Sequence, residues 1–483
     1  MMILTDHGAI ITYDDYDENN RPRIVSYPNG MTINLDWDGA GRVRRIQAVT
    51  PASGPLVDLR YQYVPGSNLL HCFTDTDGTI AVYSYDVLNQ LTAEDRHTGL
   101  PSDVCTDQQL IVGSNAGHRA WTYDANNNRA SQILGLQPRQ TTTLYQYDDA
   151  DELASTSTPG FPGFGTTITD LFPPGFGTTT INSYAYDRDG NLTDRSDGLR
   201  FDYDAANHTT GITPPLIAGG AANKLVMQYS GLDQTQRTSL KVGGAPATLF
   251  TYDGTGIGPS ILQPGAAGAA PSFITRTPGD KLVSLRRGGN TYFYITDRLG
   301  SVVALTTGSS AKFGPTSVAN RYRYSPWGEI LPQSVETVPQ PFRFAGAEYD
   351  ASTGLYKMGA RYYDPAIGRF TQIDRLGGGG RQYAVQTQAQ CRAIACERKL
   401  DDFAGQCLSF AIEQRFDCER GAVACTLGLT RWAAALALDE WAPPLISRCI
   451  YSHLSQSSIG KGRLKQPGGL RNSPNGSGTQ DNP

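Results

Sequence analysis

The chain has 483 residues and a mass of 52.2 kDa, which is long enough for several domains and a sizeable hydrophobic core. Its formal charge of -5, from 41 basic and 46 acidic residues, excludes an electrostatic footprint for nucleic acid over the whole chain. With 53 Gly, 29 Pro and 25 Tyr against 5 Met, the composition favours short aromatic strands joined by tight turns over a large helical bundle.

The first residues, 1–13, contain no basic segment followed by an apolar one, so no ordinary secretory signal is visible. Export is therefore expected to use a non-classical route. The most apolar run, residues 422–438, contains Arg431 and is shorter than the roughly 20 apolar residues that span a bilayer. The sequence predicts a buried helix there and no membrane span.

A short aromatic unit recurs along the chain. It consists of Tyr-x-Tyr or Tyr-Asp, then an Asn, Asp or Gly turn, then a strand beginning Leu, Val or Ile. Alternate aromatic positions place two rings on one face of a strand, and the Asp with its turn residues reverses the chain. Each unit is a hairpin without its own core, so hairpins must stack side by side to become stable. The sequence therefore predicts a mainly β fold, a curved antiparallel sheet of hairpins. Clear copies begin at Tyr83, Tyr145 and Tyr184, and weaker ones at Tyr13, Trp37, Tyr61, Tyr123, Tyr203, Tyr252, Tyr292 and Tyr322.

The last part of this array carries a distinctive series of motifs. In chain order they are DRLGS at 297–301, YSPWGE at 324–329, FRFAG at 342–346, TGLY at 353–356, RYYDP at 361–365 and GRF at 368–370. The Tyr-Asp units resemble the YD repeats of the RHS family, and this series resembles the RHS repeat-associated core. The resemblance covers roughly residues 10–376. It implies that the hairpins wind into a partial, spiralling β-shell.

In the RHS family the repeat-associated core acts as an intramolecular aspartic protease, and the resemblance carries the two carboxylates onto Asp350 and Asp374. Paired carboxylates that share one proton let one activate water while the other polarises the scissile carbonyl. Arg343 is a candidate to position one carboxylate through a charge-assisted bond, with a structural ion pair as the alternative. The alternative for Asp350 and Asp374 is that they are turn or cap residues. Two strands, 354–363 and 368–373, are expected between them.

The sequence departs from the family pattern after Asp374. Arg375 stands where the family has Pro, glycines follow at 377–380, and the second Asp-Pro segment that normally precedes the cut is missing. The sequence therefore leaves open whether the chain cleaves itself near the glycine run.

The tail beyond the glycines changes to helical spacing and is expected to form a small α-helical domain. Disulfides, free buried thiols and a metal site are all open for its cysteines. A metal site is the least favoured, because no Cys-x-x-Cys pair occurs and His453 is the only tail histidine. The tail cysteines are Cys391, Cys396, Cys407, Cys418, Cys425 and Cys449.

We therefore expect a YD-repeat array at 1–290, the repeat-associated core at 291–376, a variable cysteine-rich helical domain at 377–455 and a disordered tail at 456–483. The resemblance implies a secreted or cell-surface β-shell that presents or encloses a toxin-like C-terminal effector for bacterial competition. Its partners would be its own C-terminal domain as cargo, an immunity protein and secretion-system components. No cofactor, metal or nucleic-acid partner of the repeat body is expected.

The alternative function is a cell-surface adhesion module whose exposed aromatic rings stack on carbohydrate. A conventional enzyme acting on small metabolites is a third interpretation, which no cofactor loop or metal constellation in the sequence supports.

Overall fold

The computed structural model describes residues 2–6, 9–51, 54–98, 114–136, 139–159, 179–215, 223–230, 236–253, 258–277, 279–308 and 316–373. The chain divides into two compact units, Met1–Phe410 and Ala411–Pro483. Every described residue belongs to the first unit, so the fold below is that of this unit alone.

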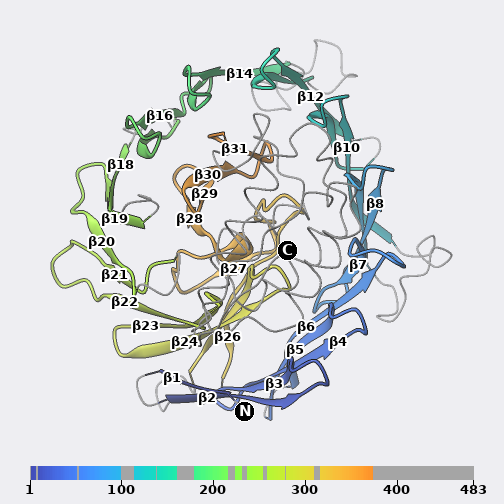
Figure 1. The fold of residues 1–483 in the computed structure, drawn as a ribbon, viewed down its shortest axis with the longest axis vertical. Coiled ribbons are helices and arrows are strands. Elements are labelled where there is room, and N and C mark those ends of the chain that lie inside the picture. Colours follow the sequence, from blue (N-terminus) through green and yellow to red (C-terminus); the bar gives the residue numbers. More distant parts are fainter. Residues whose placement is uncertain are drawn as a thin grey trace, which may run out of the picture. The chain divides into compact units, whose positions relative to one another are not determined.

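A single antiparallel sheet of 27 strands makes up most of the described chain. Each strand pairs with the next one in sequence, from β1 to β27, so the sheet is one continuous meander (Figure 1). The predicted mainly β, antiparallel sheet of hairpins is thereby confirmed. The first half comprises β1 (Met2–Asp6), β2 (Ala9–Tyr16), β3 (Pro22–Ser26), β4 (Thr32–Trp37), β5 (Val43–Thr50), β6 (Gly54–Tyr63), β7 (Leu70–Thr74), β8 (Ile80–Tyr85), β9 (Leu91–Thr98), β10 (Ser114–Tyr123), β11 (Arg129–Leu134), β12 (Thr141–Tyr147), β13 (Leu153–Thr158) and β14 (Thr180–Tyr186).

The second half of the meander continues in the same order. It comprises β15 (Leu192–Arg195), β16 (Arg200–Tyr203), β17 (Thr209–Thr213), β18 (Leu225–Ser230), β19 (Gln236–Val242), β20 (Thr248–Thr251), β21 (Ile261–Gln263), β22 (Ser272–Arg276), β23 (Leu282–Arg287), β24 (Asn290–Thr296), β25 (Val302–Thr307), β26 (Val318–Arg321) and β27 (Val335–Glu336). We call strands β1–β26 the repeat wall. Residues 322–373, which follow it, are called the inner segment.

The aspartate of each Tyr-Asp unit holds its turn together. In the turn after β10, the Asp124 carboxylate accepts hydrogen bonds from the backbone N–H groups of Asn126 at 2.9 Å and Asn128 at 2.8 Å. Asn127 between them has φ of 67°, a left-handed conformation that Asn and Gly tolerate best. The same pair of bonds recurs at Asp17, Asp38, Asp86, Asp148, Asp187, Asp204 and Asp297.

The tyrosine before that aspartate ties its hairpin to the preceding one. The Tyr123 hydroxyl donates to the Leu91 carbonyl at 2.7 Å, and Leu91 is the first residue after the preceding turn. The tyrosine hydroxyl of each repeat therefore donates to a backbone carbonyl of the preceding repeat, and the tyrosine ring packs between the two repeats. Equivalent bonds join Tyr63 to Val43, Tyr85 to Leu70, Tyr147 to Arg129, Tyr203 to Leu192, Tyr229 to Thr209, Tyr252 to Arg237 and Tyr324 to Val302.

The end of the repeat wall packs against its beginning. Ile11 and Met31, from the first hairpins, share one hydrophobic core with Phe293 and Ile295 on β24. Asn29 adds polar contacts, because its side-chain amide donates to the Thr307 carbonyl at 3.0 Å and its own carbonyl accepts from Thr316 at 2.8 Å. The meander thus curves until the turn at Asn29 contacts Thr307, 278 residues later in the sequence.

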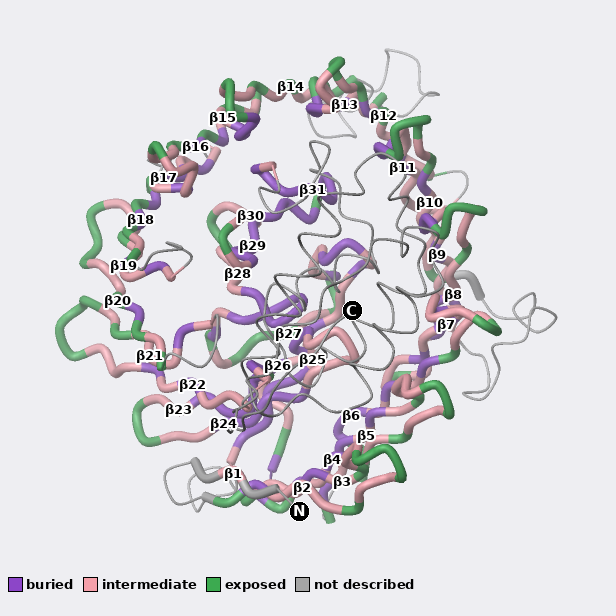
Figure 2. The backbone as a smooth tube through the Cα atoms, viewed as in Figure 1, coloured by how far each residue is buried: buried purple, intermediate pink, exposed green. Residues whose placement is uncertain are grey.

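The inner segment forms a second, four-stranded antiparallel sheet. Its elements are η1 (Phe344–Gly346), β28 (Glu348–Asp350), β29 (Leu355–Met358), β30 (Arg361–Asp364) and β31 (Arg369–Phe370). Figure 2 shows that β29–β31 are largely buried and β28 is half-buried, whereas exposed residues concentrate at the turns of the repeat wall.

One strand expectation was wrong in its extent. Residues 354–363 form two strands, because Gly359 takes φ of 57° and turns the chain between Met358 and Arg361, which pair directly. The expected single strand overlooked this two-residue turn, since it carries neither Asn-Gly nor Asp-Gly.

The predicted helical domain at 377–455, the disordered tail and the tail cysteines lie outside the described residues. Within the described ranges, no helix is long and apolar enough to cross a membrane.

Removing one tyrosine hydroxyl tests how much its hydrogen bond to the preceding repeat stabilises the protein. Tyr123→Phe keeps the ring but leaves the Leu91 carbonyl without its donor, so we expect the free energy of unfolding to fall by about 1–2 kcal/mol. Urea denaturation of the purified protein measures this change. Tyr16→Phe is the control, because the Tyr16 hydroxyl has no hydrogen-bond partner among the described residues. Equal effects of the two substitutions would contradict the proposed role of the hydroxyl.

Candidate functional site

The inner segment carries two of the three candidate catalytic residues, Arg343 and Asp350, and its aromatic side chains dock it against the repeat wall. Trp327 packs edge-on against Trp121 of β10, with ring centroids 6.0 Å apart. Arg129 of β11 stacks on the Trp327 ring, with its guanidinium carbon 4.2 Å from the ring centroid. Gly368 lies so close to this pair that a Cβ atom there would come within 2.3 Å of the Arg129 side chain. Gly368 also has a φ of 66°, so a larger residue there would be strained as well as crowded.

Ionic contacts join the inner segment to successive hairpins of the wall. Arg323 reaches Asp75 at 2.8 Å and Asp77 at 2.7 Å in the turn between β7 and β8. Farther along the wall, the Arg195 guanidinium contacts the buried Asp364 carboxylate of β30 at 2.7 Å. Further contacts of this kind are Arg96 with the Tyr324 carbonyl, Arg369 with Asn128 and with the Asp151 carbonyl, and Arg237 with Glu348. The wall is thus fastened to the inner segment along most of its length.

Asp350, the first candidate carboxylate, lies at the end of β28 and holds the following turn. Its carboxylate accepts from the backbone N–H groups of Ser352 at 2.9 Å and Thr353 at 3.0 Å, and from both of their hydroxyls. Gly354 closes the turn by donating its N–H to the Asp350 carbonyl at 2.8 Å. These contacts are those of a turn-capping aspartate, the structural alternative raised by the sequence.

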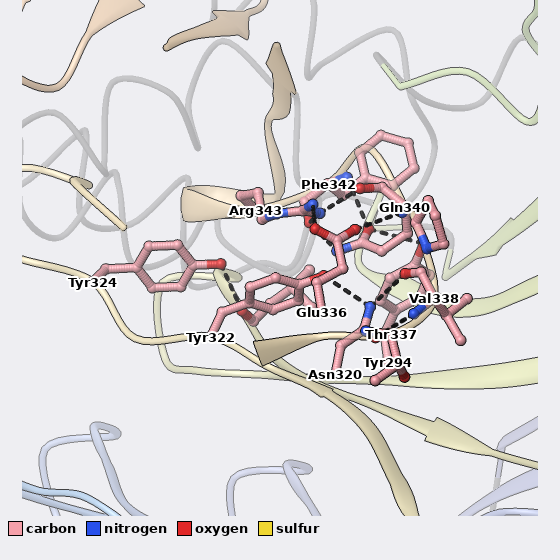
Figure 3. A network of polar contacts seen from close by, with 12 residues as sticks. Tyr294, Asn320, Tyr322, Tyr324, Glu336, Thr337, Val338, Gln340, Phe342 and Arg343 are labelled. Atoms are coloured by element: carbon pink, nitrogen blue, oxygen red, sulfur yellow. Dashed lines mark hydrogen bonds and ion pairs between the residues drawn. The ribbon is translucent and has the colours of Figure 1, made fainter. Parts of the chain in front are cut away.

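Arg343, the candidate positioning residue, is engaged by a different acid. Its guanidinium contacts the Glu336 carboxylate at 2.7 Å and lies 4.3 Å from the centroid of the Tyr322 ring (Figure 3). It also donates to the carbonyls of Gln340 and Phe342, which fixes the bend that precedes η1. The structure describes no hydrogen bond between Arg343 and Asp350. The ion-pair alternative therefore accounts for the Arg343 contacts.

Asp374, the second candidate carboxylate, lies outside the described residues. The convergence of Asp350 and Asp374 accordingly stays a prediction.

Sequence reasoning missed two buried carboxyl groups in the inner segment. Burial raises the pKa of Asp364 above its ordinary value, and the nearby Arg195 guanidinium opposes that rise. Burial likewise raises the pKa of Glu329, against the influence of Arg119 and of a hydrogen bond to Ser325. The motifs that contain them, RYYDP and YSPWGE, were visible in the sequence, but only the fold shows that these carboxyls are buried.

A buried lysine is the most perturbed cation of the inner segment. Lys357 of β29 lies directly opposite Glu348 on β28 and Tyr362 on β30. Burial lowers its pKa from 10.5 to about 8; Glu348 opposes the shift, and Arg237 of β19 adds to it. Its amine donates to the Gly359 carbonyl at 2.7 Å. The Lys357 ammonium and the Arg237 guanidinium thus both face the Glu348 carboxylate, where the inner sheet meets β19.

Two cavities border the inner segment. One of about 120 Å³ is lined by aromatic, aliphatic and charged side chains of the wall and inner segment, including Tyr61, Arg96 and Phe344. Another of about 360 Å³ is more polar and is lined by Asp77, His118 and Arg119 among others. Across the described ranges, no group of three or more His, Cys, Asp or Glu residues could hold a metal ion.

Residues 270–378 match the family model of the teneurin YD-shell. The chain is 29% identical over 201 residues to the tRNA3(Ser)-specific nuclease WapA of Bacillus spizizenii, covering 41% of this chain and 8% of that protein. It is 26% identical over 361 residues to the toxin protein Tse5 of Pseudomonas aeruginosa, covering 64% of this chain and 26% of that protein. It is 25% identical over 230 residues to the double-stranded DNA deaminase toxin A of Burkholderia cenocepacia, covering 41% of this chain and 16% of that protein.

Among solved structures, the chain is similar to the crystal structure of TcdB2-TccC3-Cdc42, with a TM-score of 0.39 and 16% identity, covering 79% of this chain and 21% of that one. The chain therefore spans about a quarter or less of the length of each of these proteins.

A wall of Tyr-Asp hairpins that runs directly into a motif-bearing inner segment defines a YD-repeat β-shell protein. Residues 270–378, which match the teneurin YD-shell, contain the motif series that resembles the RHS repeat-associated core, and the similarity to Tse5 supports an RHS/YD-repeat protein.

The buried lysine predicts a pH dependence of stability. Because the pKa of Lys357 is lower in the native than in the unfolded protein, the unfolded state binds the extra proton between about pH 8 and 10.5. The contribution of Lys357 to the free energy of unfolding therefore becomes more favourable to the folded state as the pH rises from about 8 to 10.5. We expect Lys357→Met to raise the free energy of unfolding by on the order of 2–3 kcal/mol at pH 7 and by much less at pH 9.5.

Urea denaturation at the two pH values measures this difference. Lys241→Met, which changes an exposed lysine on β19, is the matched control and should show no pH-dependent gain. If Lys357→Met changed stability equally at both pH values, the lowered pKa would not be the cause.

Proposed function

We propose that this chain is the shell part of an RHS-family toxin that presents or encloses a C-terminal effector for delivery in bacterial competition. The observation that carries the proposal is the fastening of the wall to the inner segment, since Arg195 on β15 and Arg237 on β19 both reach into it. The chain that follows Ile373 therefore continues from a segment held by the wall. Two relatives that each match 41% of this chain are named for different activities on nucleic acid.

Within this proposal the domain boundaries are those suggested by the motifs. Residues 1–290 form the repeat array and 291–376 the repeat-associated core. Residues 377–455 are the variable cargo domain, which ends in the tail at 456–483. An immunity protein and components of a secretion system are the proposed partners.

The proposed location is outside the producing cell, either secreted or on its surface. Among the described residues, Cys72 on β7 is buried and disulfide-bonded, which suits an oxidising compartment. The relative Tse5 is named a toxin protein, which is consistent with export.

Intramolecular cleavage is the proposed means of releasing the cargo, with Asp350 and Asp374 as the carboxylate pair and Arg343 as the residue that orders the bend before them. In this role Asp350 would exchange its hydrogen bonds with Ser352 and Thr353 for contacts with the reacting groups. Both carboxyl groups must come within hydrogen-bond reach of the reacting groups for this step.

The carbohydrate-binding alternative gains no support from the described tyrosines. The repeat hydroxyls bond to neighbouring carbonyls, and rings such as those of Tyr61 and Tyr294 are buried. Their packing uses the faces that would stack on sugar rings.

Expression in bacteria tests the proposed cargo. We expect residues 377–483 produced alone to stop growth, residues 1–376 to be harmless, and the full chain to be less harmful than the tail. Growth curves after induction measure this difference. Normal growth with the tail, verified as present by immunoblot, would argue against a toxin-like effector.

Denaturing gels of the purified full chain test the proposed cleavage. We expect a released C-terminal fragment that is absent from Asp374→Asn and from Asp350→Asn. Asp148→Asn is the matched control, because it alters a turn-capping aspartate in the wall. A single intact band in the unsubstituted protein would show that the chain keeps its cargo attached.

A further inference from the structure

Three motifs that stand out in the sequence meet at one cavity of the fold. DRLGS contributes Arg298 and Leu299 to its lining, YSPWGE contributes Tyr324, and FRFAG contributes Phe344. The cavity has a volume of about 120 Å³ and lies between these motifs and strands β6–β9 of the repeat wall. The candidate catalytic residues within the described ranges do not line it, so it is a separate site.

The wall side of this cavity is apolar because side chains alternate along each strand. Leu59 and Tyr61 are two residues apart on β6, so they share one face of the sheet. Tyr61 lies directly opposite Phe73 on β7, with ring centroids 5.4 Å apart, and Tyr83 and Tyr85 extend the lining onto β8. Since an apolar cavity of about 150 Å³ can hold benzene, a cavity of this size suits a single aromatic ring.

One polar group in the lining has an unused hydrogen bond. Tyr61 is only 5% exposed, and its hydroxyl has no hydrogen-bond partner within the part of the chain that the structure describes. The repeat tyrosines Tyr63 and Tyr85 differ, because each donates its hydroxyl to a carbonyl of the preceding repeat. Buried polar groups are normally hydrogen-bonded, so a leftover donor in a cavity lining indicates a ligand that brings an acceptor.

A second cavity, of about 360 Å³, adjoins the first, since Asp75, Arg96 and Arg323 line both. Among the described residues, five arginines and three aspartates line the two cavities together. The arginines are Arg96, Arg119, Arg298, Arg321 and Arg323, and the aspartates are Asp75, Asp77 and Asp297. Arginines remain in excess even when Glu94, which pairs with two of them, is counted.

The nearby carboxylates are engaged within the fold. Asp297 accepts from the backbone N–H groups of Leu299 and Ser301, both at 2.8 Å. The others form ion pairs of 2.7–2.9 Å, namely Arg323 with Asp75 and Asp77, and Glu94 with Arg96 and Arg119. The excess positive charge therefore favours an acceptor that is itself an anion.

Arg298 brings positive charge close to the unused hydroxyl. Burial raises the pKa of Tyr61 and of Tyr83, and the Arg298 guanidinium opposes both rises. A carboxylate at this point would accept a hydrogen bond from Tyr61 and face Arg298, and such charge-assisted contacts are among the strongest that proteins make. An aromatic ring attached to the carboxylate would pack among the rings of the wall.

We propose that the cavity between β6–β9 and the DRLGS, YSPWGE and FRFAG motifs is a binding site for a small aromatic carboxylate. The ring lies in the apolar cavity, and the carboxylate is held by the Tyr61 hydroxyl and the surrounding arginines. The ligand contacts both the wall and the inner segment, so its binding strengthens their attachment. The site requires neither cleavage nor a toxic cargo and therefore goes beyond the proposed function.

Titration calorimetry of the purified full chain with benzoate tests this site. We expect a Kd of about 1 mM or tighter. Benzyl alcohol keeps the ring without the charge, and acetate keeps the charge without the ring. Each should bind at least about tenfold more weakly than benzoate.

Three substitutions locate the bound ligand. Tyr61→Phe removes the unused donor and should weaken benzoate binding by about tenfold without lowering the unfolding temperature, because the hydroxyl bonds to nothing in the described fold. Leu299→Trp fills the cavity and should abolish binding. Tyr27→Phe is the matched control, since Tyr27 packs against the same hydrophobic core as Tyr61 but lines neither cavity. Thermal unfolding of each variant verifies that it is folded.

Several results would overturn the proposal. A Kd for benzoate weaker than about 1 mM removes the site, and equal binding of acetate means an adventitious ion only. Equal binding of benzyl alcohol overturns the assignment of a carboxylate. Unchanged affinity in folded Tyr61→Phe or Leu299→Trp places benzoate elsewhere. None of these measurements depends on cleavage or growth arrest, so their failure is distinct from failure of the proposed function.

Discussion

The hydrogen bond from a tyrosine hydroxyl to the backbone of the preceding repeat is the interaction on which the rest of this structure depends. A two-stranded hairpin is marginal in water, because it buries too little apolar surface to offset its ordering. The bond from Tyr147 to the Arg129 carbonyl, like its counterparts, joins a ring, a turn and a neighbouring hairpin in one contact. Repetition of this contact turns marginal units into a continuous wall, much as neighbour interactions stabilise other repeat proteins.

The wall could be predicted from the sequence because its chemistry is local. Tyr, Asp and a left-handed Asn or Gly occur within a few residues of one another, and each has a role in the same turn, as at Tyr123, Asp124 and Asn127. The alternation of rings set the face that packs, and the turn set the register. The missed turn at Gly359 shows the limit, since nothing next to it in the sequence signals a reversal.

The attachment of the inner segment could not be predicted in this way. Arg195 and Asp364 are separated by 169 residues, and Arg237 and Glu348 by 111. Nothing in the spacing selects these partners, because many other arginines and acids were available. For the same reason, sequence reasoning could nominate Arg343 as a partner of a catalytic carboxylate, whereas the fold pairs it with Glu336. For Asp350 the sequence left a catalytic and a turn-capping role open, and its described bonds are those of the turn.

The strictly sequential pairing of the strands has a consequence for synthesis on the ribosome. Each strand finds its partner in the stretch made just before it, so the wall can assemble as it emerges, with short loops to close at most steps. The inner-segment residues that fasten the wall are translated only after β26. Before β24 is made, the apolar faces of the early hairpins lack the side chains that cover them. A nascent chain of this kind stays open, and vulnerable to aggregation, for most of its translation.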